Sequence, residues 1–481
     1  MRRVALAFLL VLYACAGVPV DHPAPAPQSL ADAFAAAVRR QPRALFASLD
    51  APVGPQALVD GQNTVTVAGH LGAWRARDGS WLVHVPATGA RITAYSTSEG
   101  AAGAMLNVRG TNQTDVHASR LALPCAVVPC DALVVASTGS GRGGYWEAPG
   151  RSQCDQMLAV VFVPYQVGPG LLRPPAIGND SLTRFLRTLP IPESIVDVAT
   201  LPSVVDVDGL PIDWSAWGHG KPTIPYLTAL LRRFGGECYD GWATDTRTPD
   251  HQHPGYGTAY ASVVSQAGLQ LCSTAPSAAK LELALAVVQR GLDLVGAFAD
   301  SRRNYPSGGH MAGRKALVVL AGHLMAIEPM ANPTSVVGPV FQEDGTYTAQ
   351  PWWFGEWTAG WRFALTPPGD GALLGSPPAT WGPVDAVQHD SFAWQIAGYM
   401  PQVVGAQVGT ALTMRLLGRT RELGAAFDAM IDQWMQGPPA AARAQLELVG
   451  IRLPWQTSYS MVKGGGLCEA AWRRYASLPR T

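Results

Sequence analysis

The pattern of hydrophobic and polar positions changes once along this chain, near residue 213. Before that point, apolar residues alternate with polar ones, as in Thr64–Val67, or form short continuous runs, as in Met157–Pro164. Alternation predicts strands with one buried face, and short apolar runs predict strands buried on both faces. Asp78-Gly79 between two apolar runs predicts a hairpin turn. Because turn residues recur at short spacing, we expect residues 60–212 to form an antiparallel β-sandwich.

After residue 213 the apolar positions recur every three to four residues, which predicts amphipathic helices. A further short helix is expected inside a linker that spans residues 17–59. The expected helices of the second half are Ile224–Phe234, Tyr256–Cys272, Ala278–Ala299, Met311–Ile327, Ser391–Leu417, Glu422–Met435 and Glu469–Ala476. We therefore expect residues 213–481 to form an α/α-toroid-like helical domain, so that the whole chain is an α+β multidomain protein.

Residues 1–16 have the features of a signal peptide. Two arginines precede the apolar run Val4–Tyr13, which is too short to span a membrane. Leu12–Cys15 resembles a lipoprotein box, whereas Ala14–Ala16 fits an ordinary cleavage site, and both alternatives remain open. Either one predicts an exported protein that is periplasmic, extracellular or an outer-membrane lipoprotein. Contact with a membrane is expected only through a lipid anchor on Cys15.

Composition and cysteine content limit the compartments and the partners that we expect for this protein. The chain has 481 residues, 15% of them charged, and its formal net charge is zero. It contains no basic stripe, so a nucleic-acid partner is not expected. Six cysteines follow Cys15: Cys125, Cys130, Cys154, Cys238, Cys272 and Cys468. An even number in an exported chain predicts disulfides, first between Cys125 and Cys130 and next between Cys238 and Cys272. Zinc is not indicated, because no CxxC pair exists.

The stretch that begins at Asn304 gathers groups suited to an anionic substrate. Tyr305 and His310 lie on either side of a glycine pair, and Arg314 and Lys315 follow where an apolar helix is expected to begin. Helix-start amides and the two cations can hold a carboxylate, with Asn304 beside them. His310 can accept a proton near neutral pH. The alternative is a capped helix start with a few solvated polar residues.

A second stretch, Cys238–Gly257, combines aromatic, acidic and imidazole groups in one expected loop. His253 is another candidate proton acceptor, and Tyr256 is a candidate proton donor like Tyr305. The remaining candidates of this loop are Trp242 and His251 for substrate binding and Asp240, Asp245 and Asp250 as alternative acid/base groups. His251 and His253 could also form a metal pair, although no third ligand is identified. The alternative is a polar loop stabilised by Asx turns.

A third stretch, Trp352–Trp361, is rich in tryptophan. Exposed indoles stack well on sugar faces, so we expect Trp353 and its neighbour Glu356 to contact a glycan. The alternative is an aromatic cluster buried between helices.

Several motifs support a resemblance that covers most of the chain. The motifs are Leu172-Arg173-Pro174-Pro175, Gln252-His253-Pro254-Gly255-Tyr256-Gly257, Gly308-Gly309-His310, Gly313-Arg314-Lys315 and Trp472-Arg473-Arg474-Tyr475. In these the chain resembles a largely uncharacterised family of exported bacterial proteins from polysaccharide-degrading organisms. More distantly it is similar to polysaccharide lyases of the alginate and heparin type, although in those the sandwich often follows the toroid. This resemblance implies glycan degradation on a helical toroid.

Together these features predict an exported lyase that cleaves a uronic-acid-containing polysaccharide by β-elimination. The first alternative is a glycoside hydrolase, which needs two carboxyl groups about 5–10 Å apart. Asp240, Asp245, Asp250 and Glu356 are its candidates. The second alternative is a non-catalytic surface protein that binds glycans through its tryptophans. The lyase prediction requires no cofactor, and a metal ion has no support beyond the two histidines.

Overall fold

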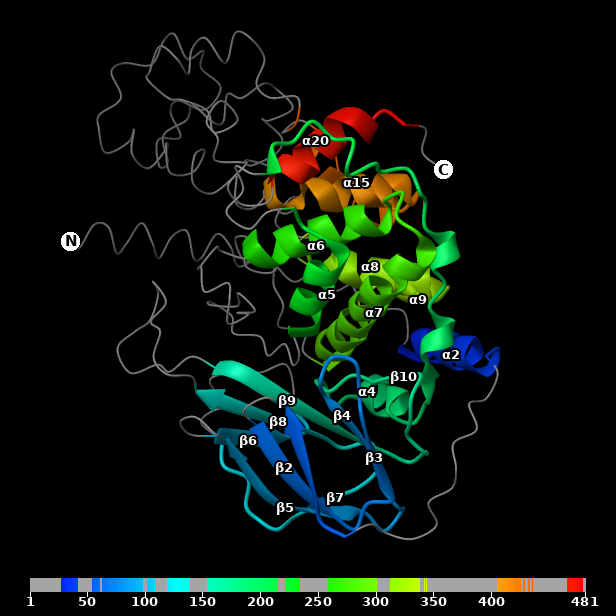
Figure 1. Cartoon of the computed structure of the whole chain (residues 1–481). Helices are drawn as coiled ribbons and strands as arrows, with labels where there is room; N and C mark the ends of the chain where they lie inside the picture. The colour runs from blue at the N-terminus through cyan, green and yellow to red at the C-terminus, as the bar shows by residue number, and fades with distance from the viewer. Residues whose placement is uncertain are drawn as a thin grey trace, which may run out of the picture.

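The computed structural model combines helices with β-sheets, which confirms the predicted α+β class (Figure 1). The sheets lie at one end of the molecule and most helices at the other (Figure 1). The structure describes residues 27–41, 54–60, 63–97, 102–108, 119–138, 154–214, 221–233, 258–300, 312–337, 341, 343, 405–424, 427–428, 431–432, 435 and 465–478.

A four-stranded antiparallel sheet has the order β1-β2-β5-β7. Its strands are β1 (Gln56–Asp60), β2 (Asn63–Ala68), β5 (Ala90–Thr97) and β7 (Cys125–Val127). Along β2, buried residues alternate with half-buried ones, and Val65 and Val67 are fully buried. The strand predicted at Thr64–Val67 is therefore confirmed, and its period of two reflects a sheet with one covered face.

A five-stranded sheet has the order β3-β4-β9-β8-β6. Its strands are β3 (Gly72–Arg75), β4 (Trp81–His84), β6 (Ala102–Leu106), β8 (Ala132–Thr138) and β9 (Cys154–Val163). β3 and β4 form the hairpin predicted around Asp78-Gly79. However, β4 and β9 run parallel, so the expectation of purely antiparallel pairing is wrong for this pair. Hydrophobic alternation indicates which face of a strand is buried, but it carries no information on strand direction.

Strand β9 explains the apolar run at Met157–Pro164, because both of its faces are covered. Leu158 and Phe162 lie in a core cluster that draws residues from both sheets. Val161 and Val163 belong to a separate cluster on the opposite side. The five-stranded sheet is thus the middle layer between the four-stranded sheet and the segments that lead to the helices.

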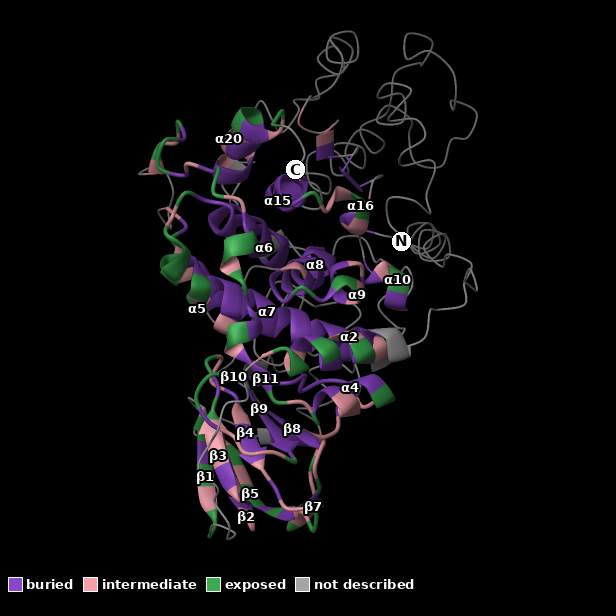
Figure 2. Cartoon of the chain, turned by 90° about the vertical axis from the view of Figure 1, so that its right-hand side faces the viewer, coloured by how far each residue is buried: buried purple, intermediate pink, exposed green. Residues whose placement is uncertain are grey.

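The helices stack in successive layers over the five-stranded sheet, from α7 outward through α8 and α6 to α15 and α20 (Figure 2). Their bounds are α2 Pro27–Arg39, α4 Ser181–Leu186, α5 Ile224–Arg233, α6 Thr258–Leu271, α7 Ser277–Asp300, α8 Arg314–Leu324, α9 Glu328–Ala331, α10 Thr334–Val337, α15 Val408–Leu416, α16 Thr420–Leu423 and α20 Gly465–Tyr475. Short 3-10 turns are η1 Glu193–Ile195, η2 Val198–Thr200 and η7 Gly405–Gln407, and β10 (Leu171–Leu172) pairs with β11 (Ile191–Pro192). Each predicted helix of the second half overlaps one of these helices, although several ends differ. The prediction Glu422–Met435 shares only its first two residues with α16, and the part of Ser391–Leu417 before residue 405 lies outside the described residues.

Two features of the helical core were not evident in the sequence. Helix α2 lies within the predicted linker, yet its Leu30 and Phe34 are buried in the main helical core. Helices α7 and α8 approach closely at Gly291, where a Cβ atom would overlap the side chain of Ala321 and lie 2.9 Å from the Leu317 carbonyl oxygen. Glycine is therefore required at this crossing, since a larger residue would push the two helices apart.

Buried Arg187 connects the sheets to the helical part without a carboxylate partner in its hydrogen bonds. Its guanidinium donates to four backbone carbonyls, those of Cys130, Pro175, Ala176 and Gly178. Burial lowers the pKa of Arg187 to about 10. Because Arg187 follows α4 directly, these bonds fix that helix against the turn before β8.

The predicted disulfides are not formed among the described cysteines. Cys125, Cys130, Cys272 and Cys468 are free thiols. Cys125 lies in β7 opposite Ile92, whereas the Cys130 amide donates to the Phe162 carbonyl of β9, so each is held by a different strand. The expected pairing of Cys125 with Cys130 is therefore wrong. Cys272 is fully buried and unpaired, which also contradicts its pairing with Cys238, a residue outside the described part.

The targeting segment at residues 1–16 also lies outside the described residues. Within the described part, no helix combines the length and apolar character that a membrane crossing needs.

Candidate functional site

The start of α8 is the part of the predicted site that the structure describes. Gly313 precedes the helix with a φ of +84°, in the left-handed region that favours glycine. A Cβ atom on Gly313 would lie 2.9 Å from the Ala261 Cα of α6. Both the backbone angle and the contact with α6 therefore require glycine, and together they fix where α8 begins.

Arg314 and Lys315, the first two residues of α8, are only 1% and 2% exposed. The guanidinium carbon of Arg314 lies 4.4 Å from the centre of the Tyr260 ring. Nζ of Lys315 donates to the Leu423 carbonyl oxygen at 2.7 Å. The aromatic ring and the carbonyl group therefore orient the two cations at the start of the helix.

Glu343 is a third charged residue at this helix start. Its Oε1 accepts a hydrogen bond of 2.8 Å from the Gly313 amide, and the residue is 1% exposed. The first amides of a helix have no partner within the helix, and a carboxylate there is favoured by the helix dipole. We did not predict Glu343, because it lies in a glycine- and proline-rich stretch without periodicity.

All other predicted site residues lie outside the described part of the chain. These are Asn304, Tyr305, His310, His251, His253, Tyr256, Trp242, Trp353, Glu356, Asp240, Asp245 and Asp250. The structure therefore brings Arg314 and Lys315 together, and the assignments of the remaining residues stay predictions.

A second charged cluster lies where the β3–β4 hairpin meets α7, and we call it the junction ring. Arg173 forms a bidentate ion pair with Asp293 of α7, at 2.6 and 2.7 Å. Asp78, from the hairpin turn, accepts from Arg173 at 2.9 Å and from Arg290 of α7 at 2.9 Å. Arg290 and Asp293 close the ring at 3.2 Å. All four side chains are buried, and their formal charges cancel.

The electrostatics of the junction ring favour the ionised states of Asp78 and Arg173. Burial alone would raise the pKa of Asp78, but Arg173 and Arg290 hold it well below its usual range. Burial would likewise lower the pKa of Arg173, but Asp293 and Asp78 raise it. Such a balanced arrangement is typical of a structural ion-pair network, since no charge is left for a ligand.

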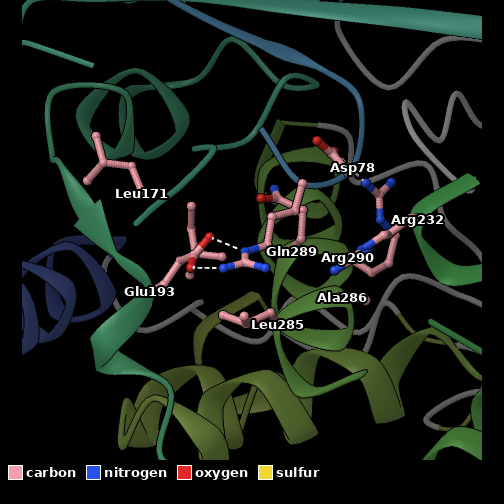
Figure 3. A pocket seen from close by; sticks show the side chains of 10 residues that line it. Asp78, Leu171, Glu193, Arg232, Leu285, Ala286, Gln289 and Arg290 are labelled. Atoms are coloured by element: carbon pink, nitrogen blue, oxygen red, sulfur yellow. Dashed lines mark hydrogen bonds and ion pairs between the residues drawn. The ribbon is translucent and has the colours of Figure 1, made fainter. Parts of the chain in front are cut away.

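A small pocket borders the junction ring (Figure 3). Leu172 and Leu285 line its apolar side, and Arg77 and Arg232 line its charged side. Arg77 is bonded to Glu193 by two hydrogen bonds of 2.6 and 2.8 Å and to Glu282 at 2.7 Å. Arg232 is also paired with Glu282. Carboxylates of the chain therefore already bind both guanidinium groups that line this pocket.

The C-terminal motif has a packing role in the structure. The guanidinium carbon of Arg415 in α15 lies 4.3 Å from the centre of the Trp472 ring in α20. The Tyr475 hydroxyl accepts from the Asp206 amide at 2.9 Å. These contacts anchor α20 to α15 and to the segment after β11.

The comparisons with known proteins find no match: no family model, no curated protein and no solved structure matches this chain. Among the residues that the structure describes, no group of three or more His, Cys, Asp and Glu side chains is arranged to hold a metal ion.

Proposed function

We propose that this protein is an exported polysaccharide lyase whose site lies at the start of α8. The observation that carries the proposal is the placement of Arg314 and Lys315, two adjacent buried cations, at the N-terminal end of that helix. Amides at a helix start and guanidinium groups both favour a carboxylate. A uronic acid is a sugar unit that carries such a carboxylate on its ring.

The proposed reaction removes the proton from the carbon next to the uronate carboxylate. Arg314 and Lys315, together with Asn304, would neutralise the carboxylate and stabilise the enolate that develops. His310 or His253 would take the proton. Tyr256 or Tyr305 would donate a proton to the leaving glycosidic oxygen as its bond to the uronate ring breaks, which leaves a double bond in the uronate at the new non-reducing end. Lys315, His251, Trp242, Trp353 and Glu356 would contribute to substrate binding.

The architecture is consistent with this proposal in two respects. Two sheets that share one core cluster support the interpretation of the N-terminal part as a β-sandwich. The packing of α7 on α8, of α6 on α15 and of α15 on α20 supports a toroid-like helical array for the C-terminal part. The proposed export follows from the basic and apolar start of the chain, with a lipid anchor on Cys15 as one of its two forms.

The test is a screen of purified protein on alginate, heparin-type and pectate polysaccharides. Elimination creates an unsaturated uronate that absorbs in the near ultraviolet, and we expect this absorbance to rise with at least one substrate. New reducing ends without absorbance would indicate hydrolysis instead. Binding without either product would indicate a glycan-binding protein, and both outcomes would refute the lyase proposal.

A further inference from the structure

Two residues from the stretch after α10 contact two other helices. One of them lies at the end of α7, and the other lies at the start of α8. Phe341 packs against α7 near its last residue, and Glu343 binds the residue before α8. We infer that Phe341 and Glu343 are positioning residues that hold Arg314 in its place at the start of α8. The inference rests on the proposed function for the role of Arg314, whereas the contacts of Phe341 and Glu343 are independent of any function.

The contact of Phe341 fixes the end of α7. Its ring centre lies 4.3 Å from that of Phe298, with the two planes tilted by 57°. Phe298 is two residues before Asp300, where α7 ends, and both rings are buried. A tilted aromatic pair stabilises by about 0.5–1.5 kcal/mol beyond the area it buries, so this contact also restricts orientation.

The contact of Glu343 fixes the start of α8. The hydrogen bond from the Gly313 amide to Oε1 is 2.8 Å long and buried. Hydrogen bonds are strongly directional, so this bond restricts the position of the Gly313 amide. Gly313 is adjacent to Arg314, so a shift of this amide moves the guanidinium as well.

The same segment reaches the group that binds Lys315. A Cβ atom on Gly424 would lie 3.4 Å from the Glu343 carbonyl oxygen. The neighbouring Leu423 carbonyl accepts the hydrogen bond from Lys315. A shift of Glu343 would therefore affect the positions of both cations. It would move Arg314 through Gly313, and it would move the carbonyl that binds Lys315 through the end of α16.

Positioning matters because catalysis depends steeply on geometry. A displacement of about 1 Å can cost on the order of 100-fold in rate even when it originates away from the reacting atoms. Loss of the Glu343 contact should therefore lower kcat more than it raises KM, whereas a general loss of stability should leave the kcat of folded molecules unchanged.

The experiment compares Glu343→Ala, Glu343→Gln and Phe341→Leu with Met330→Ala as a control. Met330 is a fully buried residue of α9, and its truncation destabilises the helical core without removing the hydrogen bond partner of Gly313. For each variant we would measure the melting temperature, and kcat and KM on the uronate polymer that wild type cleaves. We expect Glu343→Ala to lower kcat by about 10–100-fold. Glu343→Gln, which keeps an acceptor oxygen, should recover much of that loss, and Met330→Ala should keep kcat.

A second readout separates this inference from the proposed function. Amide hydrogen exchange in a peptide that covers Gly313 reports the Glu343 bond whether or not any substrate is known. We expect Glu343→Ala to accelerate exchange there by at least about tenfold, more than Met330→Ala does at a matched distance from its melting temperature. If wild type cleaves no uronate polymer, the proposed function fails and this exchange result alone decides the inference. Equal exchange in Glu343→Ala and wild type, or an unchanged kcat in an active protein, would overturn it.

Discussion

The junction ring and the start of α8 are two buried charged regions that differ in how their charges are satisfied. In the junction ring, two guanidinium groups face two carboxylates at 2.6–3.2 Å. At the start of α8, Arg314 lies on an aromatic ring and Lys315 on a carbonyl, while Glu343 binds a backbone amide. In the junction ring, the charged groups pair with each other and link the β3–β4 hairpin to α7. At the start of α8, an aromatic ring and a carbonyl group orient the two cations, and we propose this helix start as the site for an anionic substrate.

The largest effect should come from breaking the junction ring with Arg173→Met. This variant leaves Asp78 and Asp293 with less compensation in a buried site, so we expect a loss of about 3–5 kcal/mol in the free energy of unfolding. Urea unfolding measures it. The matched control is Arg77→Met, which breaks ion pairs of a side chain that is 47% exposed and should cost at most about 1 kcal/mol. Similar losses in both variants would show that burial does not distinguish the two ion-pair sets.

A smaller effect is expected at the start of α8 from Gly313→Ala. The alanine would have to adopt a φ of +84° and would place its Cβ against Ala261, so we expect a loss of about 1–3 kcal/mol. Gly170→Ala is the control, because Gly170 has a φ of +80° but open space around its Cβ position. Thermal unfolding of both variants should show the larger loss for Gly313→Ala. An equal loss would mean that α6 does not constrain the helix start.

The smallest expected effect is a pH dependence of stability that comes from His70, a residue outside both charged regions. His70 is fully buried, and neither ring nitrogen has a hydrogen-bond partner, so burial lowers the pKa of its imidazole below the usual value. The unfolded chain therefore binds a proton at a higher pH than the folded protein does. The contribution of neutral His70 to the free energy of unfolding should be fully present above about pH 6.5. It should decrease as the pH falls from there toward the pKa of His70 in the folded protein.

The measurement is the urea midpoint of wild type and His70→Leu between about pH 7.5 and 5.5. The variant should show a flatter pH dependence than wild type, although burial also lowers the pKa values of His84 and His323 and leaves a residual slope. Identical slopes would show that His70 does not contribute.

Much of the fold could be predicted because it depends on local patterns. The apolar periods gave the strand at Thr64–Val67 and the long helix now described as α7. The hairpin at Asp78-Gly79 followed from turn chemistry, but the same Asp78 binds Arg173 and Arg290, which are 95 and 212 residues away. Partners at such distances leave no trace in a local pattern.

The candidate site shows the same limit. Arg314 and Lys315 could be predicted because two adjacent cations opened an expected helix. Glu343 could not, since its partner Gly313 is 30 residues away and its own stretch has no periodicity. The disulfides were predicted from an even count, an exported context and closeness along the chain, and none of these shows which strands hold each cysteine.

The central claim is that the start of α8 acts on the substrate whereas the junction ring only supports the fold. The most direct test is the kcat per folded molecule of Arg314→Lys and Arg173→Met on the uronate polymer that wild type cleaves, below both melting temperatures. The account predicts that Arg314→Lys lowers kcat by at least about tenfold, because a point charge cannot replace a planar donor fork. It predicts that Arg173→Met loses stability but keeps kcat within about twofold, since its partners lie in the junction ring. An active Arg314→Lys variant beside an inactive Arg173→Met variant would contradict the account.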